Sequence, residues 1–223
     1  MPVRTPLLVG AVVLLAVAVS VFARNRHHGT PAENPAAGVF DYYLMSLSWS
    51  PTYCATHPDD DTQCARKGYG FVLHGLWPQY QRGGGPQHCA TESRPDRKTV
   101  DRTLAFMPSR RLIEHEWSTH GACSGLSPKA YFDLADQAFT GIHVPARFEA
   151  PGHPLHLTAE TIIDDFRSAN PGLASGAVTV HCSRGELAEV RVCVDRDLAP
   201  RACGARVRTN CPRDDAIVVP ALR

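Results

Sequence analysis

Apolar and polar residues follow strand-like patterns in the first third of the chain. Residues 41–54 mix apolar, aromatic and polar side chains, which predicts a strand that runs into a loop at Pro51. The short apolar run 71–73 is followed by a polar histidine and a glycine. This pattern predicts a buried strand with His74 at its end.

Two stretches near the C-terminal end alternate apolar and polar residues with period two, as strands with one buried face do. They span 177–182 and 186–195, and Ser183-Arg184-Gly185 lies between them. Glycine after polar residues favours a tight turn, so the two stretches predict a hairpin. The apolar stretch 217–222 is a candidate last strand.

Three segments carry the periodicity and the end signals of helices. Each begins beside a side chain that can cap the first turn, namely Ser109, Ser127 or Thr158. The predicted helices span 109–121, 126–139 and 157–172. Because strands and helices interleave without a regular repeat, the pattern predicts an α+β fold. A chain of 223 residues that is 43% hydrophobic is long enough to bury the core of one domain.

The N-terminal region has the composition of an export signal. Arg4 is followed by an uncharged apolar run of 17 residues, Leu7 to Ala23, with small residues near its end. We interpret 1–23 as a signal peptide, with an uncleaved membrane anchor as the alternative. Residues 24–38 are then a polar linker, and 39–223 form the exported domain. We expect a secreted, periplasmic or extracellular protein that contacts a membrane only if this segment is retained.

The number of cysteines agrees with export, because eight can form four disulfides in an oxidising compartment. The chain contains no Cys-x-x-Cys pair of the kind that zinc knuckles use. Many connectivities are possible, and the spacing alone does not choose between them. The cysteines are Cys54, Cys64, Cys89, Cys123, Cys182, Cys193, Cys203 and Cys211.

The charge balance and one histidine-rich segment narrow the function. The formal net charge is only +1, so an anionic substrate would be recognised by a local site rather than by a general positive field. In the segment HEWSTHGAC, His115 and His120 are five residues apart, whereas the zinc-protease motif places its histidines four apart on one helix face. Glu116 and His120 are four apart and share a helix face, so we expect the carboxylate to orient His120 or to tune its charge. With His74, this gives two imidazoles that can act as base and acid near neutral pH.

The segments FVLHGLWPQ (71–79) and HEWSTHGAC (115–123) resemble the two active-site segments of the ribonuclease T2 family. The segments SLSWSPTYC (46–54) and ELAEVRVCVDRDLAPRAC (186–203) resemble that family too. The similarity covers about 40–211. It implies a disulfide-stabilised single domain with a central, mostly antiparallel sheet flanked by helices. It also implies an endoribonuclease that cleaves single-stranded RNA through a 2′,3′-cyclic phosphate, with no metal or other cofactor. DNA lacks the attacking 2′-OH, so we expect no cleavage of DNA.

The resemblance assigns roles to four residues of these segments. It implies that His120 is the general base and that His74 is the general acid, which protonates the leaving 5′-oxygen. It implies that Glu116 helps to balance the charge of the site and that His115 binds phosphate.

Three further residues are candidates for substrate binding. Trp77 and Tyr80 could stack on bases, although either could instead be a packing residue. Thr119 stands where the family usually has a lysine, and it offers substrate only a neutral hydroxyl. We therefore expect slower catalysis than in relatives that carry the lysine.

The resemblance also implies one set of disulfides and leaves two alternatives open. The implied pairs are Cys54–Cys64, Cys89–Cys123, Cys182–Cys211 and Cys193–Cys203. One alternative is a zinc hydrolase, and the other is a catalytically weakened family member that binds RNA or a protein partner. Retention of His74, Glu116 and His120 favours the enzyme, which we expect to be a monomer.

Overall fold

The computed structural model describes residue 1 and residues 36–65, 67–212 and 215–222. The predicted signal segment 1–23 and most of the linker 24–38 therefore lie outside the described residues, apart from Met1. Within the described part, no helix is long and apolar enough to cross a membrane. Gly38, the last residue of the predicted linker, donates its backbone N–H to the carbonyl of Cys123 at 2.8 Å.

Six strands form one sheet, in the order β2-β1-β5-β6-β3, with β4 paired to β5 beside this path. All pairs are antiparallel except β5 with β6. This confirms the predicted mostly antiparallel sheet of an α+β fold. The strands are β1 (Tyr42–Trp49), β2 (Phe71–Gln79), β3 (Leu155–Leu157), β4 (Val178–Ser183), β5 (Glu186–Val194) and β6 (Ile217–Val219).

The two faces of β1 pack in different environments. Tyr43, Met45, Leu47 and Trp49 point into the main hydrophobic core. The alternate residues Tyr42 and Leu44 pack in a smaller cluster with Cys193. Because side chains alternate along a strand, Ser46 and Ser48 follow on that second face. This face of the sheet therefore changes from apolar to small polar side chains in the second half of β1.

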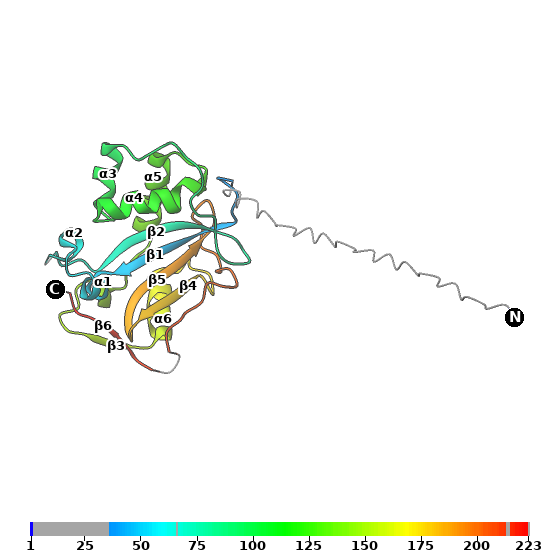
Figure 1. The fold of residues 1–223 in the computed structure, drawn as a ribbon. Helices are drawn as coiled ribbons and strands as arrows, with labels where there is room; N and C mark the ends of the chain where they lie inside the picture. Colours follow the sequence, from blue (N-terminus) through cyan, green and yellow to red (C-terminus); the bar gives the residue numbers. More distant parts are fainter. Residues whose placement is uncertain (2–35, 66, 213–214, 223) are drawn as a thin grey trace. The chain divides into compact units, whose positions relative to one another are not determined.

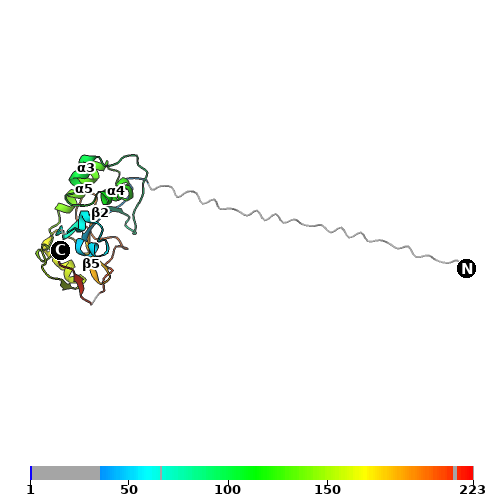
Figure 2. The ribbon, with the colours of Figure 1, turned by 60° about the vertical axis from the view of Figure 1, so that its left-hand side comes forward.

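The predicted helix starts are present, since Ser109, Ser127 and Thr158 each accept a hydrogen bond from the backbone N–H three residues later. Figures 1 and 2 show α3, α4 and α5 grouped beside β2, while α6 lies with β4. The helices are α1 (Ser50–Thr56), α2 (Asp61–Cys64), α3 (Arg97–Thr103), α4 (Arg110–Thr119), α5 (Pro128–Thr140) and α6 (Ala159–Ala169), with short 3-10 turns η1 (Gly121–Ser124) and η2 (Ala146–Phe148).

Several short elements differ from the sequence-based expectation. The loop expected at Pro51 is instead α1, because proline is well tolerated in the first turn of a helix. Within the predicted polar loop, Asp60 caps α2, and Asp96 caps α3 further along the chain. Residues 155–157 form the short strand β3, so the helix predicted from 157 begins only at Ala159.

Four disulfides tie this fold together, and they join the same cysteines that the family resemblance implies. The Cys89–Cys123 bond links the loop after β2 to the turn that follows α4. It thereby connects the two segments that carry His74 and His120. The pairs are Cys54–Cys64, Cys89–Cys123, Cys182–Cys211 and Cys193–Cys203.

Candidate active site

His74 lies at an irregularity in the middle of β2. In the pairing with β1, Ser46 faces Gly75 and Leu47 faces Leu73, so His74 is the extra residue of a β-bulge. A bulge re-aims the side chain of its extra residue. The expectation that His74 ends its strand was wrong, because the bulge absorbs the additional residue and lets β2 continue to Gln79.

The His74 ring lies between two carboxylates. Its Nδ1 is 2.7 Å from Glu189 Oε1, and its Nε2 is 3.7 Å from Glu116 Oε1. Burial acts to lower the pKa of His74. The hydrogen bond with Glu189 and the charges of Glu189 and Glu116 act in the opposite direction and together raise this pKa above its usual value. His74 is therefore held toward its protonated form.

Glu189, on β5, is itself held by an arginine. Arg191 donates from Nε and Nη2 to Glu189 Oε2, at 2.8 and 2.6 Å. Burial acts to raise the pKa of Glu189, but His74 and Arg191 outweigh it and lower this pKa to about 2. The carboxylate is thus ionised, with one oxygen bonded to His74 and the other to Arg191. Neither residue was among the candidate site residues, although both lie in the segment 186–203 that resembles the family and carry opposite charges two positions apart on a predicted strand.

Glu116 is directed at the sheet from α4 and is only 1% exposed. Trp77 Nε1 donates to its Oε2 at 2.7 Å. A Cβ atom at Gly75 would collide with both of these atoms, so the bond requires glycine at that position. Burial raises the pKa of Glu116 to about 7, although the charge of His74 and the Trp77 bond act against the rise.

The expectation that Glu116 orients His120 was wrong, because the carboxylate has other partners. The Glu116 carboxylate contacts Trp77 and His74 instead. The physical reason is that α4 ends at Thr119, and His120 has the backbone angles of a C-cap, φ −119° and ψ −50°. The alignment of residues four apart holds only within a helix, and His120 has left it.

His120 shares a neighbour with His74. The Trp77 ring centroid lies 5.3 Å from that of His120 and 5.1 Å from that of His74, so one indole contacts both imidazoles. Burial lowers the pKa of His120 to about 4, helped by the charges of His115, His74 and His88. His120 is therefore held toward its neutral form, opposite to His74.

The other three predicted site residues have different surroundings. His115 is exposed on α4 and lines a pocket together with His88, Arg94 and Arg111. Tyr80 is half-buried and packs against the main core. Thr119 is 6% exposed, and its Oγ1 is buried with no hydrogen-bond partner in the described part of the chain.

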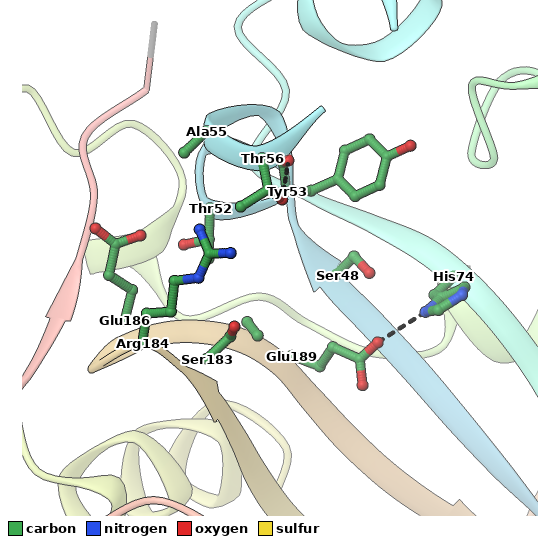
Figure 3. Close-up of a pocket in the computed structure, with 11 residues that line it drawn as sticks. Ser48, Thr52, Tyr53, Ala55, Thr56, His74, Ser183, Arg184, Glu186 and Glu189 are labelled. Carbon is green, nitrogen blue, oxygen red and sulfur yellow. Dashed lines mark hydrogen bonds and ion pairs between the residues drawn. The ribbon is translucent and has the colours of Figure 1, made fainter. Parts of the chain in front are cut away.

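A pocket of about 290 Å³ opens beside His74, Glu189 and Ser48. In Figure 3, the Glu189 side chain extends past Ser48 to the His74 ring, and the remaining labelled residues come from α1 and the β4–β5 turn. Among residues that the structure describes, no three His, Cys, Asp or Glu side chains gather closely enough to hold a metal ion.

Chemically, the group offers one imidazole that favours the protonated form and one that favours the neutral form. Environments that push two pKa values apart are how sites set an acid beside a base. The arrangement can take a proton from one oxygen and give a proton to another during a single displacement.

Comparison with known proteins finds a family whose model matches this chain. The model of the ribonuclease T2 family matches residues 40–203. A ribonuclease of Aeromonas hydrophila is 54% identical over 99 residues, which is 44% of this chain and 45% of that protein. A probable ribonuclease of Haemophilus influenzae is 27% identical over 201 residues, covering 83% of this chain and 68% of the relative. The chain thus spans about half the length of the first of these relatives and about two thirds of the second.

A solved structure shares the fold. RNase NT in complex with 5′-AMP has a TM-score of 0.60 and 23% sequence identity, and the match covers 82% of this chain and 98% of RNase NT.

Proposed function

This chain belongs to the ribonuclease T2 family, and from that membership we propose that it cleaves single-stranded RNA without a metal ion. In the proposed reaction the ribose 2′-oxygen attacks the adjacent phosphorus, and the bond from phosphorus to the 5′-oxygen breaks. The products are a 2′,3′-cyclic phosphate and a free 5′-OH. DNA has no 2′-OH and should remain intact.

The observation that carries this mechanism is the contrast between the surroundings of the two histidines: His74 lies between two carboxylates, whereas His120 is largely buried with other histidines nearby. His120, with its pKa lowered to about 4, is neutral near pH 7 and takes the proton of the 2′-OH. His74, with its pKa raised, keeps a proton and gives it to the leaving 5′-oxygen. Each histidine then holds the form that its partner began with.

Three neighbours complete the proposed site. Glu116 faces His74 from α4, and its charge favours the protonated imidazole. Trp77 fixes the Glu116 carboxylate through its indole N–H, and its ring contacts both imidazoles. His115 is exposed beside this group, where it is free to bind a phosphate oxygen. Binding of 5′-AMP by RNase NT, which has the same fold, supports a nucleotide site of this kind.

The proposal includes export. Four disulfides favour an oxidising compartment, since cytosolic thiols are kept reduced. We assign the export signal to the N-terminal segment 1–23. The linker 24–38 and the catalytic domain 39–223 follow it, and the domain acts as a monomer.

The test is incubation of the purified protein with single-stranded RNA in EDTA, followed by analysis of both product ends. Cyclic-phosphate and 5′-OH ends are expected. RNA of the same sequence with 2′-O-methyl groups is the matched control, because it lacks only the nucleophile. Products with 5′-phosphate ends, or cleavage of the methylated RNA, would overturn the proposed reaction.

A further inference from the structure

We propose that Glu189 and Arg191 are positioning residues for acid catalysis by His74, an inference that rests on the proposed function. Glu189 holds Nδ1 of the ring, and Arg191 holds Glu189. As a result, Nε2 is the nitrogen that delivers the proton to the leaving 5′-oxygen.

The hydrogen bond fixes which nitrogen reacts. An ionised carboxylate only accepts hydrogen bonds, so His74 Nδ1, 2.7 Å from Glu189 Oε1, is the donor. Nε2 then carries the proton that can leave, and it faces the side of Glu116, 3.7 Å away. When the Nε2 proton passes to the 5′-oxygen, the ring becomes neutral. The other proton stays on Nδ1 and remains hydrogen-bonded to Glu189.

The sheet leaves room for this contact to cross a strand. Strand β1 lies between β5 and β2. On β1, Ser48 lies opposite Glu189 and Ser46 lies opposite Arg191. Both serines are small, and Ser46 is fully buried. Figure 3 shows the Glu189 side chain reaching past Ser48 to His74. Large side chains at these two positions would stand between the carboxylate and the imidazole.

Arg191 connects the acid to the rest of the site. Both of its bonds go to Glu189 Oε2, which leaves Oε1 for His74. Its guanidinium also lies 5.5 Å from the centre of the Trp77 ring. One arginine therefore contacts both the carboxylate that orients His74 and the indole that holds Glu116. A planar, two-nitrogen contact of this kind is one that lysine cannot reproduce.

The charges around His74 determine the expected sign of a substitution. The facing groups are Glu189 and Arg191 on β5, Glu116 on α4, His120 at the end of α4, and His181 on β4 opposite Glu189. Glu189→Gln removes a negative charge from this set and keeps an acceptor oxygen. The pKa of His74 should fall, and the alkaline limb of kcat/KM should move to lower pH.

An NMR titration tests the contact without requiring activity. In protein labelled with 15N at histidine, neutral His74 should be protonated at Nδ1, and its pKa should be lower in Glu189→Gln. Glu186→Gln is the matched control, because Glu186 lies on the same strand but beside the turn in Figure 3, away from His74. An unchanged pKa in Glu189→Gln, or a proton at Nε2 in the neutral ring, would overturn the proposal.

Kinetics with two leaving groups then test the positioning role. A dinucleoside phosphate needs a protonated leaving oxygen, whereas a nucleoside 3′-(4-nitrophenyl phosphate) releases a stable anion. Glu189→Ala should lower kcat on the first substrate by at least about tenfold, a part of the ~10²–10⁴ that one acid supplies, and change kcat little on the second. Arg191→Gln should show the same selectivity, and Arg191→Lys should lose less.

The outcomes separate the two levels of inference. Equal losses on both substrates would mean that Glu189 supports the fold only, and would overturn the positioning role. If wild-type protein formed no cyclic phosphate, the proposed function would fail, while the NMR titration would still decide whether Glu189 sets the state of His74.

Discussion

The surroundings of His74 and His120 differ in charge although both rings contact the same indole. His74 is on a strand bulge between Glu189 and Glu116, and their negative charges raise its pKa. His120 is at the end of a helix, where burial and the neighbouring histidines lower its pKa to about 4. The pKa of the same residue type is thus shifted in opposite directions by two different environments.

This difference indicates how the site keeps its two tasks apart. If both imidazoles kept the ordinary pKa near 6.5, much of the protein at any pH would carry the wrong pair of protonation states. Opposite shifts widen the pH range in which the base is neutral and the acid is protonated. Trp77 lies against both rings and adds no charge to the environment of either one.

The largest predicted effect comes from removing either histidine. His74→Ala and His120→Ala should each lower kcat on a dinucleoside phosphate by about 10²–10⁴, the usual contribution of one acid or base. On a nitrophenyl ester, His74→Ala should regain most of the lost rate, because that leaving group needs no proton. His120→Ala should stay slow on both substrates. Steady-state kinetics with the two substrates measure the contrast.

His156→Ala is a matched control, because His156 is an exposed histidine on the edge strand β3. It should have wild-type rates on both substrates. If His120→Ala rather than His74→Ala regained activity on the ester, the acid and base would be exchanged and the comparison reversed.

The next effect is on pH dependence. The proposed mechanism needs neutral His120, so kcat/KM should rise as the pH increases through about 4. It also needs protonated His74, so kcat/KM should fall as the pH increases through that residue's raised pKa. Well outside these limits the change should approach about tenfold per pH unit.

Glu116 has a pKa of about 7 and its Oε1 lies 3.7 Å from His74 Nε2, so the alkaline limb belongs to this interacting pair rather than to one residue. The profile is measured at constant ionic strength with a dinucleoside phosphate. An acid limb near the ordinary histidine pKa would show that the surroundings of His120 do not lower its pKa, and would remove the contrast with His74.

Sequence patterns predicted the parts of this fold that local chemistry determines. Ser109, Ser127 and Thr158 cap helices because their hydroxyls reach backbone N–H groups three residues away. The turn at Arg184 and Gly185 has positive φ at both positions, 53° and 81°, which suits a two-residue hairpin. The family resemblance added the two active-site segments.

The features that the sequence did not predict depend on pairing between strands that are far apart in the chain. The bulge at His74 exists only in the register between β1 and β2, and a single strand carries no sign of it. Glu189 is 115 residues from its partner His74. On its own strand it resembles any solvent-facing charge. The contact with His74 appears only because β1 pairs with both β2 and β5 and places small serines between the two side chains.

The smallest predicted effect concerns Thr119, the residue before His120. As a substrate contact, its hydroxyl would have to reach the solvent side of the site. The structure buries Oγ1 instead and gives it no partner among the described residues. The Thr119 carbonyl is nevertheless in use, since it accepts the backbone N–H of His88 at 2.9 Å. A change of the side chain that preserves its shape should leave that backbone contact intact.

Thr119→Val makes that change, replacing the hydroxyl with a methyl group of similar size. A buried hydroxyl without a partner costs about 1–3 kcal/mol, so the variant should be as stable as the wild type or more stable. Its kcat and KM should stay within about twofold, as for substitutions that touch no functional group. Ser118→Ala, at the exposed neighbouring position, is the control. A rise in KM for Thr119→Val but not for Ser118→Ala, at unchanged melting temperature, would show that the hydroxyl turns to the substrate during binding. The end of α4 would then have to move, although the disulfide Cys89–Cys123 holds the turn that follows it.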